Sequence, residues 1–204
     1  MSIISLFCGS YCNGQEVVRK LVDHTGYRLV EDTEVAASAA TISGLSESKI
    51  ARAFSDKTSV FNSFTHEKQR SIAYLKLALA ELLPADNLII SGFVSYLIPK
   101  KISHALRVCL IADLKFRSAV AAQQAGSTGK DALKLIRKQD ENAALWVNAV
   151  AGGNDPWAPA LHDIVIPMDK MTAEEAKDLV LRHFGREIVR PTDTSRQAAS
   201  DFLL

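Results

Sequence analysis

The residues best suited to chemistry form a short loop near the start of the chain. Gly9 and Gly14 have the spacing of the phosphate-binding motif G-x-x-x-x-G-K-[ST], in which backbone N–H groups surround an anion. Gln15 stands where this motif has lysine, and Glu16 stands where it has Ser or Thr. The loop therefore keeps the backbone frame of a phosphate site without the two side chains that hold phosphate and Mg²⁺.

Both replacements change the expected energetics of anion binding. Gln15 can donate a hydrogen bond but carries no charge, and losing a charged hydrogen bond costs about 1.5–3 kcal/mol. A carboxylate at Glu16, about 5 Å from a phosphate charge, repels it by roughly 3 kcal/mol at an effective dielectric constant of about 20, unless Mg²⁺ bridges them. Alternatively, Glu16 is a first-turn acid that stabilises the helix dipole without a ligand. The candidate cofactor-binding residues are Gly9, Ser10, Asn13, Gly14, Gln15 and Glu16.

Composition narrows the class of protein. The chain has 204 residues, 48% of them hydrophobic and 23% charged, which is typical of one globular domain. A net charge of +1 gives no electrostatic case for nucleic acid or an anionic membrane, and no run of about 18 apolar residues predicts a membrane span. Three cysteines without His/Cys spacing predict neither a disulfide framework nor a metal site, and favour a cytoplasmic location.

Apolar runs alternate with helical patterns, which predicts an α/β fold with a parallel sheet. Strands are expected at residues 3–7, 27–30, 87–91, 107–112 and 163–167. Helices are expected from the loop to about residue 26 and at residues 34–40, 46–54, 63–83, 114–124, 129–150 and 172–184. Thr172 and Glu175 have capping-box spacing at the start of the last helix. Residues 1–184 are expected to form the domain, and 185–204 a tail or a linker.

Short motifs follow one another in an order that resembles a known family. After the loop come Glu31-Asp32, I-I-S-G-F at residues 89–93, R-V-C-L-I-A-D-L-K-F-R at 107–117, I-R-K-Q-D at 136–140 and H-D-I-V-I-P-M-D at 162–169. Over residues 2–184 this series resembles the cytidylate kinase-like family of P-loop nucleoside monophosphate kinases. The resemblance implies a three-layer fold, with a five-stranded parallel sheet, helices on both faces and a helical lid near residues 126–153. It also implies transfer of phosphate from ATP to a pyrimidine monophosphate, with ATP and Mg²⁺ as the cofactors of an active enzyme.

The sequence departs from that family where its kinases carry positive charge. Besides Gln15, the position after Gly92 holds Phe93 in place of an arginine, and residues 140–150 contain no Arg or Lys where the family has lid arginines. One such cation can contribute around a thousandfold or more to the rate of phosphoryl transfer. Arg117 matches the arginine that opens the lid, which makes it a candidate catalytic residue.

The resemblance also suggests residues for an acceptor-nucleotide site. His66, Lys68 and Arg70 head the long helix between strands two and three and could supply the missing cations, with Lys68 and Arg70 as further catalytic candidates. Alternatively, they are the solvated start of a helix. Asp32 follows strand two, as an acceptor-site acid or a cap, and Lys100 follows strand three, as a phosphate contact on the cleft side.

Three functions fit these observations. The first is a degenerate kinase-like protein that binds a nucleotide, another anion or a small phosphorylated ligand, with little turnover and a regulatory role, fused to or associated with a signalling domain. The second is an active CMP-type kinase or other phosphotransferase with rearranged catalytic residues. The third is an interaction scaffold whose cleft is filled by its own side chains.

Overall fold

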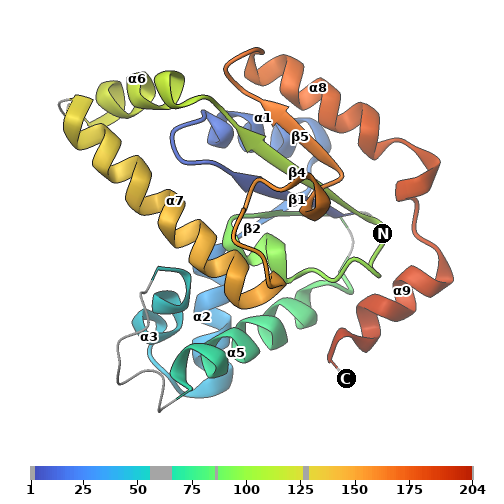
Figure 1. Ribbon diagram of the computed structural model, residues 1–204. Helices are drawn as coiled ribbons and strands as arrows, with labels where there is room; N and C mark the ends of the chain where they lie inside the picture. The colour runs from blue at the N-terminus through green and yellow to red at the C-terminus, as the bar shows by residue number, and fades with distance from the viewer. Residues whose placement is uncertain (1–2, 56–65, 86, 126–128, 204) are drawn as a thin grey trace.

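The computed structural model describes residues 3–55, 66–85, 87–125 and 129–203. Its centre is a parallel five-stranded sheet with the strand order β2-β3-β1-β4-β5. The strands are β1 (Ile3–Cys8), β2 (Arg28–Glu31), β3 (Leu88–Ser91), β4 (Ala105–Ile111) and β5 (Ile164–Pro167). Each lies within two residues of its predicted position, so the predicted fold class is confirmed (Figure 1).

β1 occupies the middle of the sheet and pairs with β3 on one side and β4 on the other. Its apolar residues point alternately to the two faces, because successive side chains of a strand do so. Ile3 belongs to one core cluster, whereas Ile4 and Leu6 belong to the other. A strand buried on both faces explains the unbroken apolar run in the sequence.

Two helices cover the face toward which Ile4 and Leu6 point. They are α1 (Gly14–Thr25) and α8 (Ala173–Phe184), which pack against each other. α8 begins with the predicted capping box, in which Thr172 Oγ1 accepts the Glu175 N–H and Glu175 accepts the Thr172 N–H. α1 ends at Gly26, as predicted from that glycine.

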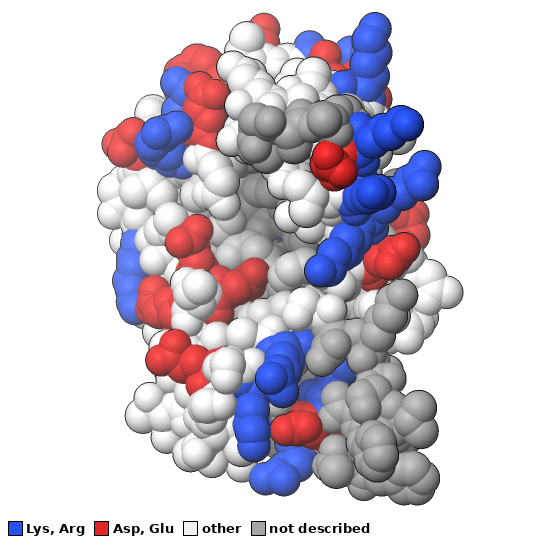
Figure 2. Space-filling view, turned by 90° about the vertical axis from the view of Figure 1, so that its left-hand side faces the viewer, with Lys and Arg blue, Asp and Glu red and all other residues white. Residues whose placement is uncertain are grey.

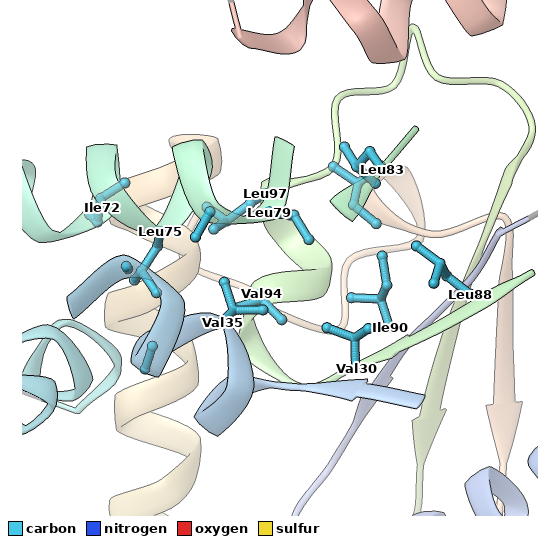
Figure 3. Close-up of a cluster of buried hydrophobic side chains, with 14 of the residues drawn as sticks. Val30, Val35, Ile72, Leu75, Leu79, Leu83, Leu88, Ile90, Val94 and Leu97 are labelled. Carbon is cyan, nitrogen blue, oxygen red and sulfur yellow. The ribbon is translucent and has the colours of Figure 1, made fainter. Parts of the chain in front are cut away.

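The opposite face carries the larger core. It is covered by α2 (Asp32–Ser43), α3 (Glu47–Ala51), α5 (Glu67–Leu82) and the 3₁₀ turns η1 (Arg52–Phe54) and η2 (Phe93–Leu97). Figure 3 shows Leu75 and Leu79 on α5 and Val35 on the neighbouring α2, in the same cluster as Ile90 of β3. The predicted helix at residues 46–54 divides into α3 and η1, and residues 63–65 of the other predicted helix lie outside the described residues.

Two further helices, α6 (Leu114–Ala125) and α7 (Gly129–Ala151), pack together, and α7 spans most of the residues expected to form the lid. α7 also contributes Trp146 to the larger core. It is followed by η3 (Pro159–Leu161), which leads into β5.

The segment after α8 lies against the body of the protein. It forms η4 (Glu187–Val189), α9 (Asp193–Ser200) and η5 (Asp201–Leu203). Ala198 and Ala199 are buried in the larger core, and Ser195 Oγ lies 2.9 Å from Nδ1 of the buried His104. These contacts hold α9 against the domain. The division at residue 184 stays a prediction.

Candidate functional site

A cavity of about 440 Å³ opens at the carboxyl ends of β1 and β3, where open α/β sheets place their ligands. Its wall combines the glycine loop, the start of α2, the end of η1, the start of η2 and one side of α7. Polar side chains in this wall are Ser10, Asn13, Gln15, Asp32, Ser55, Ser91, Gln124, Gln139, Asp140 and Asn142. Aromatic ones are Phe7, Tyr11, Phe54, Phe93 and Trp157.

The glycine loop is fixed at its base on β4. The Gly9 N–H donates to the Leu110 carbonyl oxygen at 2.8 Å, and the Cys12 thiol lies 3.5 Å from the same oxygen. Gly14 packs so tightly on β1 that an added Cβ would lie 2.6 Å from the Cys8 sulfur. Burial raises the pKa of Cys12 to about 11, so this thiol is a protonated filler of the loop.

Behind Gly14, α1 begins without a side-chain cap. Asn13 has a left-handed backbone conformation (φ 57°) and makes no capping hydrogen bond with its side chain. The first residues of α1 line the cavity, so the positive end of the helix dipole is directed toward it. This backbone frame is the one the loop sequence predicts.

Asp32 connects α2 to the start of η2. Its two carboxylate oxygens accept the N–H groups of Phe93 and Val94 at 3.0 and 2.9 Å. Burial raises the pKa of Asp32 to about 6, although these two hydrogen bonds oppose the shift and the nearby Glu31 adds to it. Asp32 therefore does not cap α2, the helix that it begins, but binds the start of η2, and it also lines the cavity.

Phe93 fills the place after Gly92 with an aromatic contact. Its ring stacks on Phe54 at 5.7 Å and lies 5.8 Å from Phe7, and its carbonyl oxygen accepts the Trp146 indole N–H at 2.8 Å. Phe7 in turn lies 5.3 Å from the ring of Trp157. A continuous aromatic wall therefore stands where the resembling kinases carry an arginine.

Arg117, the candidate catalytic arginine, lies behind the loop with its side chain 9% exposed. Its guanidinium donates to both Asp140 carboxylate oxygens at 2.6 and 3.0 Å. Nε donates to the Ser10 carbonyl oxygen at 2.7 Å, and the guanidinium carbon lies 5.9 Å from the centre of the Trp157 ring. The charge of Arg117 is therefore neutralised by Asp140 and committed to holding the loop.

Lys and Arg lie beside the cavity but are absent from its described wall. Of the described residues that form its wall, none is Lys or Arg. Figure 2, seen from the side of α6 and α7, shows a central hollow with Lys and Arg gathered along one side and Asp and Glu along the other. The outer surface of α7 carries four exposed cations, Lys130, Lys134, Arg137 and Lys138. These solvated charges lie outside the cavity wall.

The structure brings together only some of the predicted site residues. The loop residues up to Gln15, together with Asp32, line the cavity, whereas the exposed Glu16 does not. His66, Lys68 and Arg70 lie at the start of α5, with His66 just before the helix, and are not among the described lining residues.

The predicted position of Lys100 on the cleft side is wrong. Lys100 was expected on the cleft side because it follows β3, but η2 turns the chain back toward the start of β4. There Lys100 Nζ donates to the Ala160 carbonyl oxygen at 2.7 Å, at the amino end of the sheet. A parallel strand following a crossover begins at the edge opposite to the cleft, which explains the error.

Several lining residues were not predicted. Asp140 was considered only as the start of a cation-free stretch, and no sequence signal pairs it with Arg117, which lies on another helix. Trp157 reaches the cavity because the segment before β5 is held by the Pro156 carbonyl oxygen. This oxygen accepts the Tyr96 hydroxyl at 2.7 Å and lies 2.9 Å from His162 Nε2.

The wall is suited to binding by hydrogen bonds and aromatic contact. Its carboxamides and the start of α1 can bind polar groups, and its rings can contact a planar base. Within the described part of the wall, no Lys or Arg side chain lies where the charge of a phosphoryl group would spread.

Comparisons with known proteins agree with this architecture. The model of the cytidylate kinase-like family matches residues 3–170. The crystal structure of an uncharacterized protein from Eubacterium ventriosum ATCC 27560 is similar with a TM-score of 0.66, at 16% identity over 90% of this chain and 97% of that one. TT1252 from Thermus thermophilus matches with a TM-score of 0.43, at 16% identity over 89% and 97%. No curated protein matches the sequence. None of the described helices has the length and apolar character needed to cross a membrane.

Proposed function

Because the chain belongs to the cytidylate kinase-like family, we propose that its cavity binds a nucleotide or a related phosphorylated ligand and turns it over poorly. Its role is then regulatory rather than metabolic. The family supports a nucleotide as the ligand class. The proposal that this ligand is bound with little phosphoryl transfer depends on the charges around the cavity.

The observation that carries the proposal is the arrangement around Arg117. This arginine is the cation nearest to the loop among the residues discussed, and Asp140 neutralises it with two hydrogen bonds. Gln15 and Phe93 occupy two positions where the resembling kinases have cations. Since one arginine can be worth about 10³–10⁵ in the rate of phosphoryl transfer, a cavity of this kind supports binding better than turnover.

The open cavity favours a ligand-binding protein over a scaffold. A scaffold predicts that Glu16 or Phe93 fills the loop. Glu16 is exposed outside the described lining, and Phe93 forms part of a wall around about 440 Å³ of space. This volume lies within the range of small-molecule sites.

Binding and turnover can be measured separately. We expect calorimetry to detect ATP–Mg²⁺ or a pyrimidine monophosphate, and a coupled ADP-release assay to stay far below the roughly 1–100 s⁻¹ of ordinary kinases. The Gln15→Lys variant restores the loop cation and should bind ATP about tenfold more tightly or better.

Gln123→Lys is the matched control. It adds the same charge on the exposed side of α6, next to the lining residue Gln124, and should leave the affinity unchanged. Turnover by the parent at ordinary kinase rates would support the active phosphotransferase instead. If neither the parent nor Gln15→Lys binds any nucleotide tested, the interaction scaffold remains as the function that fits.

A further inference from the structure

A second cavity, of about 410 Å³, lies at the amino ends of β4 and β5. Its wall is formed by residues 160–163 before β5 together with Lys100, Ser103, Leu106 and Arg107 around the start of β4, and His183, Arg186, Ile188 and Val189 at and beyond the end of α8. In Figure 1 this is the side of the sheet near the N label, away from α6 and α7. The cavity is therefore separate from the glycine loop.

The side chains around this second cavity carry excess positive charge. Among the described lining residues, Lys100, Arg107 and Arg186 are cations, His162 and His183 add two imidazoles, and Asp163 is the single acid. The loop cavity, by contrast, has two carboxylates and no cation among its described lining residues. The net charge of +1 for the whole chain therefore hides a local concentration of cations.

Arg107 is the most buried of these cations. Its guanidinium donates to the carbonyl oxygens of Pro99 at 2.7 Å and Ala105 at 3.2 Å, and its side chain is 11% exposed. Asp163 Oδ2 accepts the Arg107 backbone N–H at 2.8 Å and lies 3.6 Å from NH1. Asp163 thus neutralises Arg107 much as Asp140 neutralises Arg117, so the positive charge offered to an incoming anion comes mainly from Lys100 and Arg186.

The other cations lie around the same space. Lys100 is held by its 2.7 Å hydrogen bond to the Ala160 carbonyl oxygen, and an ammonium group has further N–H donors for a ligand. Arg186 is exposed at the rim, one turn of chain beyond the half-buried His183. An oxyanion between them could accept several charged hydrogen bonds at once.

The remaining wall is apolar. Leu106 and Val189 are buried beneath the cavity, Leu161 is half-buried beside it, and Ile188 at the rim is 79% exposed. The cavity therefore combines a cationic side with an apolar side.

We propose that this second cavity is a binding site for a small phosphate monoester that carries an apolar or aromatic group. The phosphate lies between Lys100 and Arg186, and the apolar group lies against Leu161 and Ile188. Such a site would let the protein bind a phosphorylated metabolite independently of the ligand in the loop cavity.

Phenyl phosphate is the probe, with inorganic phosphate beside it. In an NMR titration of the whole chain, we expect phenyl phosphate to shift the amide signals of His183, Arg186 and Ile188 in a saturable way, and to bind more tightly than inorganic phosphate. The double variant Lys100→Ala/Arg186→Ala should weaken binding about tenfold or more. The control Lys101→Ala/Arg182→Ala removes two exposed cations that lie outside the wall and should have no effect.

A third variant tests at which of the two cavities phenyl phosphate binds. Gln15→Glu adds a carboxylate to the loop cavity and should leave phenyl phosphate binding unchanged. Loss of binding in that variant, an equal effect of the control pair, or the absence of saturable shifts in the parent would each overturn the proposal. If the double variant unfolds, the single variant Arg186→Gln takes its place, because it changes only one exposed side chain. It should also weaken phenyl phosphate binding, but by a smaller factor.

Discussion

Arg117 and Asp140 join α6 to α7 through two parallel hydrogen bonds of 2.6 and 3.0 Å. The pair also holds the glycine loop, because Arg117 donates to the carbonyl oxygen of Ser10. An arginine that could act on a phosphate is here a structural bridge. Substitution of Asp140 can test whether Arg117 acts as this bridge.

The Asp140→Asn substitution should separate stability from affinity. It leaves the mostly buried Arg117 without its counter-charge, and because Asp140 is 33% exposed we expect a loss of about 1–3 kcal/mol in the free energy of unfolding. The freed charge should tighten ATP–Mg²⁺ binding several-fold. Urea unfolding and calorimetry measure the two effects. Glu81→Gln, an exposed change on α5, is the control, and an Asp140→Asn variant with unchanged stability would contradict the bridge.

Asp32 should make stability depend on pH in an unusual direction. Its pKa is raised from 3.8 to about 6, so the folded chain holds a proton that the unfolded chain has released between these values. The stability contributed by this group is therefore present below about pH 4 and is lost as the pH rises to about 6, by on the order of 1–3 kcal/mol.

The Asp32→Asn variant tests that direction. The stability of the parent relative to this variant should fall between about pH 4 and 6.5 and stay constant above, as read from urea unfolding at each pH. Asp23→Asn, an exposed carboxylate on α1, should leave the pH profile of the parent intact. A difference that grows with pH would show that the carboxylate is stabilised by its two N–H donors rather than penalised by burial.

Gly92 should be among the positions least tolerant of a side chain. It has φ 114°, and an added Cβ would lie 2.6 Å from the Asp32 Cγ and Oδ1 atoms. Gly92→Ala should therefore cost about 2–5 kcal/mol, since it strains the backbone and displaces a carboxylate that accepts two hydrogen bonds. Gly44→Ala is the comparison, because Gly44 also has positive φ (70°) but no atom within 4 Å of the added Cβ. Its expected cost is about 1 kcal/mol, and equal losses in thermal unfolding would refute the close packing.

The two tryptophans should report on different parts of the molecule. Trp146 is fully buried, whereas the half-buried Trp157 lines the loop cavity. Acrylamide should therefore quench the fluorescence of Trp146→Phe, which keeps Trp157, more strongly than that of Trp157→Phe. A nucleotide in the cavity should change the fluorescence of Trp146→Phe, which keeps Trp157, and should leave that of Trp157→Phe unchanged. A ligand response that survives in Trp157→Phe would place the nucleotide elsewhere.

Local sequence patterns predicted the elements but not the contacts between them. The apolar runs of β1 and β3 and the capping box at Thr172 are local signals, and all appear as expected. The start of α9 was missed because its capping pair is Thr192 and Ser195, without the acid or amide that usually marks this motif. A polar segment with so weak a signal was interpreted as a tail or linker.

The candidate site was predictable only where the backbone alone determines it. Gly14 has no room for a side chain, because an added Cβ would lie 2.6 Å from the Cys8 sulfur, and the backbone N–H of Gly9 holds the loop on β4. The pairing of Arg117 with Asp140 depends on how two helices lie in space, and the position of Lys100 depends on the turn made by η2. Neither is encoded in spacing along the chain.

The carbonyl oxygen of Pro156, bonded by Tyr96 and close to His162, constrains the length of the chain around it. Trp157 follows it into the loop cavity, while His162 lies in the wall of the second cavity. An insertion or deletion between Trp157 and His162 would move one of these side chains out of register with its wall. We therefore expect natural variants of this protein to change residue type in that segment far more freely than they change its length.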